Sequence, residues 1–151
     1  MPDKETLKRA HEDARQGKSP STQAGEFVKQ EMDHIREGKH GARSPQQAIA
    51  IGLSEARRAG VKLPPPKKGS TSEATRSKAA RDERKGQSSA KQKTSPTRSR
   101  AVRNALKREG KDAASHAALS KQAHRAASQR GSAARKQAAK KAARTRQRRA
   151  A

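Results

Sequence analysis

Large apolar side chains are scarce in this chain and gathered in one stretch of it. Only 14 of the 151 residues are Leu, Ile, Val, Met or Phe, and nine of these lie between Phe27 and Leu63. Leu, Ile, Val and Phe together supply 12 residues, about 8% of the chain. This fraction is far below the roughly 20% under which a highly charged chain tends to be disordered. A core that spans the whole length is therefore excluded, and we expect one small folded module near the N-terminus.

Charge divides the chain at nearly the same place. Residues 1–66 carry 12 basic and 9 acidic side chains, a net of +3, whereas residues 67–151 carry 26 basic and 5 acidic side chains, a net of +21. The run of prolines at 64–66 favours extended backbone and marks the change. The domain organisation that we expect is a helical module at 1–63 with its core at 22–63, a Pro/Ser/Lys-rich linker at 64–96 with a transient helix near 73–85, and basic helical segments at 97–151.

Three helices are predicted in the N-terminal module. The first covers residues 4–16 and has one large apolar residue, Leu7, so it is marginal unless it docks. The second covers residues 22–37, and the third follows Ser44-Pro45, a pair that caps a helix and begins it without losing a hydrogen bond. The second and third form a helical hairpin. Its core, which is also its possible partner face, consists of Phe27, Val28, Met32, Ile35, Ile49, Ile51, Leu53 and Ala56.

Three further residues are expected to shape the packing of the hairpin. Gly52 in mid-helix costs up to about 1 kcal/mol relative to Ala, so we expect it to let another helix approach closely. Val61 and Leu63 are expected to fold back and close the open end. A unit below about 40 residues is rarely stable alone, so the hairpin needs the first helix, a second copy of itself or a nucleic acid.

The C-terminal half favours helix but offers little to bury. Residues 113–151 contain 11 Lys and Arg and no acidic residue, and the remainder is rich in Ala. Alanine forms helix readily yet buries little surface, and the like charges repel one another. The fold class is therefore mostly α, with a module of two to three helices followed by a basic tail that is largely disordered or conditionally helical.

The basic tail predicts non-sequence-specific binding of nucleic acid, with duplex DNA favoured. Lys and Arg side chains neutralise phosphates and release condensed counterions, which gives an affinity that falls steeply with salt. The candidate phosphate contacts are Arg98, Arg100, Arg103, Lys107, Arg108, Lys121, Arg125, Arg130, Arg135, Lys136, Lys140, Lys141, Arg144, Arg146, Arg148 and Arg149. The expected role is histone-like or nucleoid-associated.

Two other functions stay open. One is an RNA- or ribosome-associated basic protein, although the single aromatic residue argues against recognition of single-stranded RNA by base stacking. The other is an adaptor or dimerisation module formed by the hairpin, with the tail as a solubilising segment. A homo-oligomer or a protein partner would then bind through the N-terminal module.

Two segments resemble known proteins. Residues 47–60, QAIAIGLSEARRAG, are similar to the A-I-A-I-G-L-S-E-A-R-x-A-G segment of a group of small basic bacterial proteins of unknown function, and residues 26–60 fit the same group. Ser95-Pro96-Thr97-Arg98 resembles the S/T-P-x-K/R turns of linker-histone tails, and the Lys/Ala/Arg-rich run after it resembles histone-like basic proteins. A Ser-Pro helix start explains that tetrapeptide equally well. The resemblances imply helical modules with basic tails, and no catalytic residues.

The remaining signals predict no enzyme, no cofactor and no metal. The chain has no Cys, and its histidines are His11, His34, His40, His116 and His124. His34 and Asp33 lie near His40 in sequence, but this spacing matches no standard set of ligands. The acidic residues Glu31, Asp33 and Glu37 are expected to serve solubility, with Glu31 at the edge of the apolar stripe.

No apolar run reaches the roughly 18–20 residues that a membrane span needs, and residues 1–5 lack the apolar stretch of a signal peptide. We expect a cytoplasmic, nucleoid-associated protein with no membrane partner.

Overall fold

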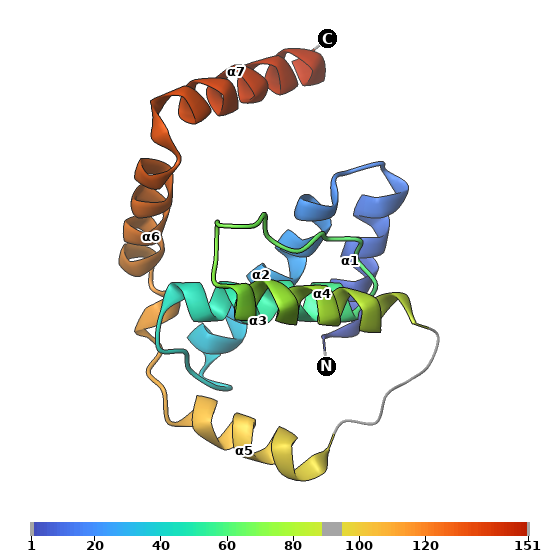
Figure 1. The fold of residues 1–151 in the computed structure, drawn as a ribbon, viewed down its shortest axis with the longest axis vertical. Coiled ribbons are helices and arrows are strands. Elements are labelled where there is room, and N and C mark those ends of the chain that lie inside the picture. The colour runs from blue at the N-terminus through green and yellow to red at the C-terminus, as the bar shows by residue number, and fades with distance from the viewer. Residues whose placement is uncertain (1, 89–94, 151) are drawn as a thin grey trace. The chain divides into compact units, whose positions relative to one another are not determined.

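The computed structural model describes residues 2–88 and 95–150, apart from the side chains of residues 149 and 150 (Figure 1). Its elements are α1 (Lys4–Arg15), α2 (Pro20–Glu37), α3 (Pro45–Arg58), α4 (Glu73–Gln87), α5 (Pro96–Lys107), the short 3₁₀ helix η1 (Asp112–Ala114), α6 (His116–Gln129) and α7 (Gly131–Ala150). The described residues contain no strand, so the prediction of a mostly α-helical chain is confirmed. Contacts divide the chain into two units, residues 1–115 and 116–151.

Serine followed by proline begins three of these helices. Ser44 Oγ accepts a hydrogen bond from the backbone N–H of Gln47 at 3.2 Å, which confirms the predicted start of α3. Ser19 and Ser95 cap α2 and α5 in the same way. In each case proline occupies the first turn, where its missing N–H costs no helical hydrogen bond.

Helix α2 ends at Gly38, as the sequence predicts. Gly38 has φ of 79° and ψ of 20°, a left-handed conformation that glycine adopts without a Cβ clash. The N–H of Lys39 donates to the carbonyl of His34 at 3.0 Å, and the N–H of Gly38 donates to the carbonyl of Ile35 at 3.1 Å. This pair of hydrogen bonds is a Schellman motif, and it turns the chain back across the end of α2.

Helices α2 and α3 cross closely at Gly52. A Cβ added to Gly52 would lie 2.7 Å from Val28 Cα and 2.9 Å from Val28 N, so the backbone of α2 occupies the space of a side chain. The prediction that Gly52 lets another helix approach is therefore confirmed. The larger apolar residues Phe27 and Ile35 are completely buried.

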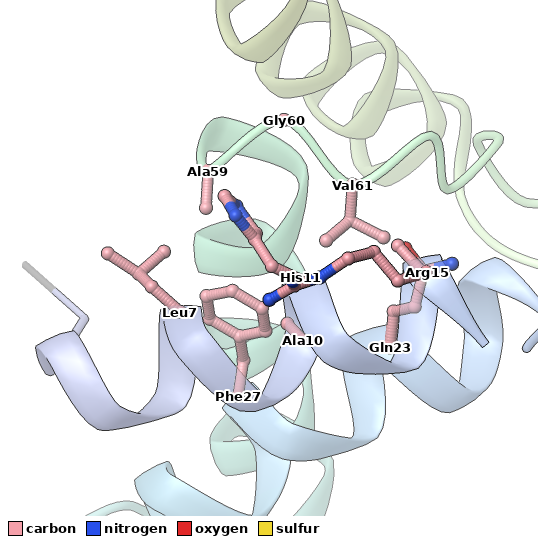
Figure 2. A pocket seen from close by; sticks show the side chains of 10 residues that line it. Leu7, Ala10, His11, Arg15, Gln23, Phe27, Ala59, Gly60 and Val61 are labelled. Atoms are coloured by element: carbon pink, nitrogen blue, oxygen red, sulfur yellow. The ribbon is translucent and has the colours of Figure 1, made fainter.

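Helix α1 docks on this hairpin and completes its core. Figure 2 shows Leu7 and Ala10 of α1 beside the ring of Phe27, in a groove that Val61 also lines. Val61 is buried in the same cluster and Leu63 packs against it, so the segment after α3 folds back as predicted. The first helix, one of the three sources of stability that the sequence leaves open, thus packs against the hairpin.

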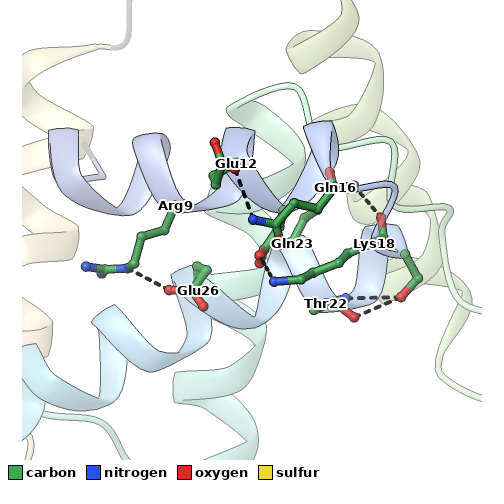
Figure 3. Close-up of polar contacts among 9 residues, drawn as sticks. Arg9, Glu12, Gln16, Lys18, Thr22, Gln23 and Glu26 are labelled. Atoms are coloured by element: carbon green, nitrogen blue, oxygen red, sulfur yellow. Dashed lines mark hydrogen bonds and ion pairs between the residues drawn. The ribbon is translucent and has the colours of Figure 1, made fainter. Parts of the chain in front are cut away.

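Polar contacts also join α1 and α2 (Figure 3). Arg9 Nε lies 2.7 Å from Glu26 Oε2, and Gln23 Nε2 donates to the carbonyl of Lys18 at 2.8 Å. Lys18 Nζ contacts Asp13 Oδ1 at 2.5 Å, which gives the buried Asp13 carboxylate a cation. Lys18, in the turn between the two helices, is therefore bonded to a residue of each.

The compact unit continues past the prolines at 64–66. Arg57, which is buried, donates from Nε to the carbonyl of Leu63 at 3.1 Å and from Nη2 to the carbonyl of Pro64 at 3.3 Å. Burial lowers the pKa of Arg57, and the nearby carboxylates of Asp82 and Glu83 partly oppose this change. One guanidinium therefore ties the extended segment to the last turn of α3.

Helix α4 lies along α3 (Figure 1), whereas the sequence predicts only a transient helix near 73–85 within a linker. Asp82 is buried; it accepts a hydrogen bond from the hydroxyl of Ser54 and lies 3.5 Å from the guanidinium of Arg58. A Cβ on Gly86 would overlap the backbone at the end of α3. The contact depends on a small residue and a charged one, which apolar periodicity does not detect. Residues 89–94 of the expected linker lie outside the described residues.

The basic segments form the helices α5, α6 and α7. The described part of residues 97–151 therefore shows no disordered tail, which differs from the sequence-based expectation. Helix α7 is exposed along its described length and buries no side chain. None of the helices in the described ranges is long and apolar enough to cross a membrane.

Candidate functional site

Helices α6 and α7, with Arg130 between them, carry ten exposed Lys and Arg side chains in the part of the chain that the structure describes. Every predicted phosphate contact of this unit whose side chain is described is exposed: Lys121, Arg125, Arg130, Arg135, Lys136, Lys140, Lys141, Arg144, Arg146 and Arg148. The side chain of Arg149 lies outside the described residues. Residues 140, 144 and 148 are four apart and so follow one face of α7, while others, such as Arg146, extend the charge around the helix.

Some cations of residues 1–115 have a carboxylate partner, whereas residues 113–151 hold no acidic side chain. Arg9, Lys18 and Arg58 each lie within 4.0 Å of a carboxylate of their own unit. Residues 113–151 contain no Asp or Glu, so the Lys and Arg of α6 and α7 have no carboxylate in their own unit to pair with. Their charge is available to an anion from outside.

Helix α5 carries the second predicted set of phosphate contacts. The side chains of this set are all exposed: Arg98, Arg100, Arg103, Lys107 and Arg108. The end of α5 is attached to the loop after α2, because the N–H of Gly41 donates to the carbonyl of Leu106 at 2.9 Å and the N–H of Ala42 donates to that of Gly110 at 3.1 Å. Val102 is 54% exposed on the same helix. The structure thus places this set on the first unit and the other set on the second.

The predicted partner face of the hairpin is largely occupied by the module itself. Its buried members are Phe27, Met32, Ile35 and Ala56, and its half-buried members are Val28, Ile49, Ile51 and Leu53. Helices α1 and α4 pack against α2 and α3 respectively, so they cover part of the apolar surface that an adaptor would offer to a partner.

A cluster of one carboxylate and two imidazoles lies at the C-terminal end of α2. Glu31, His34 and His40 each place one potential ligand atom within 4.8 Å of the other two. Glu31 Oε2 lies 3.5 Å from His40 Nε2, and the two imidazole rings meet edge to face with centroids 6.1 Å apart. Asp3 Oδ2 lies 3.2 Å from His34 Nε2.

The side chain of Glu31 is buried, with 3% of its surface exposed. Its Oε1 atom is buried and has no hydrogen-bond partner among the described residues. Burial raises the pKa of Glu31 from 4.5 to about 7; His40 opposes this rise and the carboxylate of Glu55 adds to it. A buried carboxylate with an orphan oxygen is costly unless a cation or a proton compensates it.

The sequence does not predict this cluster, because Asp33, rather than Glu31, is the acidic residue next to His34 in the chain. Asp33 instead lies 3.3 Å from Arg36, and Glu37 lies 2.9 Å from Lys39, both near solvent. Residues three apart on a helix are neighbours, so Glu31 and Glu37 are both spaced to share a face with His34, and the structure brings Glu31 into the cluster. The Glu-x-x-His spacing is a signal in the sequence, whereas the return of His40 depends on the turn at Gly38.

Comparison with known families identifies one match. Residues 15–68 match the model of a family described as a family of unknown function (DUF6496). That range includes the segment 26–60 on which the sequence resemblance rests, together with α2, α3 and the chain that folds back after them. No curated protein and no solved structure matches the chain.

Proposed function

We propose that the protein binds nucleic acid without sequence preference, through phosphate contacts of the basic helices. The observation that carries the proposal is the composition of α6 and α7, where ten exposed Lys and Arg side chains have no carboxylate in their unit. A phosphate backbone supplies the missing counter-charge at regular spacing. The cations of α7 project from a helix that buries no side chain along its described length, so packing does not hold them in the fixed positions that reading base edges requires. We therefore expect affinity that depends on salt rather than on sequence.

Binding should also stabilise the basic helices. Lys136, Lys140, Arg144 and Arg148 follow one another at four-residue intervals, and like charges at this spacing destabilise a helix by about 0.2–0.5 kcal/mol per pair. Phosphates that neutralise them would remove this repulsion, while the alanines between them keep a high intrinsic helix propensity. We therefore retain the expectation of a conditionally helical tail, which gains helix on binding DNA in a nucleoid-associated role.

A salt titration on the full chain tests the proposal. Binding to a random-sequence DNA duplex is measured for the unaltered protein and for a triple variant, Lys140→Gln, Arg144→Gln and Arg148→Gln. The slope of log affinity against log salt should become less steep by about 2.7, because each phosphate contact contributes about 0.9.

The matched control removes three exposed lysines from the other unit. Lys8→Gln, Lys29→Gln and Lys62→Gln change the net charge by the same amount, and their positions are exposed on or beside α1, α2 and α3. This variant should keep the original slope to within about one contact. Equal slopes for the α7 variant and the unaltered protein would refute the proposal. A clear preference for duplex RNA of equal length would keep the phosphate contacts and change the partner.

A further inference from the structure

We propose that Glu31, His34 and His40 form a binding site for a divalent transition metal, with zinc as the reference ion. This site is independent of the basic helices, and it departs from the expectation that the histidines bind no metal. Two imidazoles and one carboxylate are a ligand set that zinc accepts, with a fourth position left for water or another donor.

The position of the ligands along the chain makes the site local. Glu31 and His34 are three residues apart on α2, a spacing that places two side chains on one face and that helical metalloproteins use for ligation. The Schellman turn at Gly38 then reverses the chain and brings His40 to 3.5 Å from Glu31. The loop that carries His40 is held by a hydrogen bond from Gly41 to the last turn of α5 and by one from Ala42 to Gly110, just after α5.

The hydrogen bonds of the imidazoles favour ligation. His40 Nδ1 lies 3.2 Å from the carbonyl oxygen of Gly41, an acceptor that favours the tautomer with the proton on Nδ1, in which Nε2 presents its lone pair toward Glu31. Metal-bound histidines usually donate their other ring N–H to a carbonyl or a carboxylate in this manner. Asp3 Oδ2 lies 3.2 Å from His34 Nε2, a carboxylate partner that can orient this ring in the same way.

The burial of Glu31 supplies the second, independent argument. Glu31 Oε2 and His40 Nε2 lie 3.5 Å apart, and Glu31 Oε1 has no partner among the described residues. A cation between these atoms would compensate the buried carboxylate in place of a proton. Ligands about 2.0–2.1 Å from a tetrahedral zinc ion lie roughly 3.4 Å apart. Atoms now separated by up to 4.8 Å therefore need a contraction of at most about 1.4 Å, within reach of side-chain rotation.

Zinc chloride alone is the probe, titrated into the full chain without nucleic acid and in competition with a chromophoric chelator. We expect one zinc ion per chain, with shifts of the ring NMR signals of His34 and His40. His40→Asn should weaken binding by about 100-fold or more, and Asp3→Asn, which removes only an orienting carboxylate, by roughly tenfold.

Two further variants keep the result decisive. Glu31→Gln removes a ligand and a buried charge, so it should bind zinc weakly while keeping the fold, as judged from the ring signals of Phe27, the one Phe of the chain. His116→Asn combined with His124→Asn removes the two histidines of α6 and should leave the affinity unchanged. Zinc binding that survives His40→Asn and Glu31→Gln, or that is lost with the α6 pair, would overturn the proposal, as would no binding at all.

Discussion

The buried carboxylate of Glu31 leads to a defined pH dependence of stability. Because the pKa of Glu31 rises from 4.5 to about 7 on folding, the native state keeps a proton that the unfolded chain has already released. Between these two pH values the native state binds more protons, so the free energy of unfolding falls as the pH rises. A change of about 2.5 pH units corresponds to roughly 3 kcal/mol.

Glu31→Gln should abolish this loss, since glutamine has nearly the same shape and does not titrate. The variant should resemble the unaltered protein at pH 4.5 and exceed its stability at pH 8 by about 3 kcal/mol. The assay is urea unfolding of the full chain at both pH values, with a chelator present to exclude metal. The ring signals of Phe27 report on the module alone, because this completely buried residue is the one Phe of the chain.

Glu37→Gln serves as the control, since Glu37 ends the same helix but its side chain is 56% exposed. Its effect should be small at both pH values. If Glu31→Gln changes stability equally at pH 4.5 and pH 8, or lowers it at pH 8, then the charge on Glu31 is compensated in the native state. The argument from burial would then be refuted.

Two further predictions concern how the helices pack. Gly52→Ala should destabilise the module by about 1–3 kcal/mol, because the new Cβ would lie 2.7 Å from Val28 Cα. Gly25→Ala is the control: nothing lies within 4 Å of its Cβ, so it should stabilise α2 by up to about 1 kcal/mol. Urea unfolding of both variants measures the two changes. Asp82→Ala should remove the hydrogen bond that holds α4 to Ser54, so amide hydrogen exchange in α4 should become faster while exchange in α2 stays slow. Equal exchange rates in α4 before and after the change would contradict this role of Asp82.

The sequence predicts those parts of the fold that depend on helix caps, on glycine in a left-handed conformation or on the spacing of apolar residues. Ser44-Pro45 begins α3 and Gly38 ends α2, because capping hydroxyls and left-handed glycines act within a few residues. Val61 and Leu63 fold back because they are among the few large apolar residues of the chain, and they bury this surface in the cluster that contains Phe27.

The sequence does not predict contacts that depend on small or charged residues far apart in the chain. The docking of α4 uses Asp82 on Ser54 and the missing side chain of Gly86, neither of which forms an apolar stripe. The cluster at the end of α2 has the same character. His40 reaches Glu31 through the direction of a turn, and that direction is a matter of three-dimensional geometry rather than of residue spacing.

The order in which the helices pack has a consequence for synthesis. Helix α1 contacts α2, α2 contacts α3, and α3 contacts α4, so much of the packing of the first four helices joins neighbours along the chain. Helical folds with such local contacts form in microseconds to milliseconds. A ribosome that adds about 5–20 residues per second needs roughly 3–13 s for the 64 residues after residue 87. The helical module therefore has time to fold before most of the positive charge of the chain has been made, and the basic segments are synthesised as an extension of a body that is already folded.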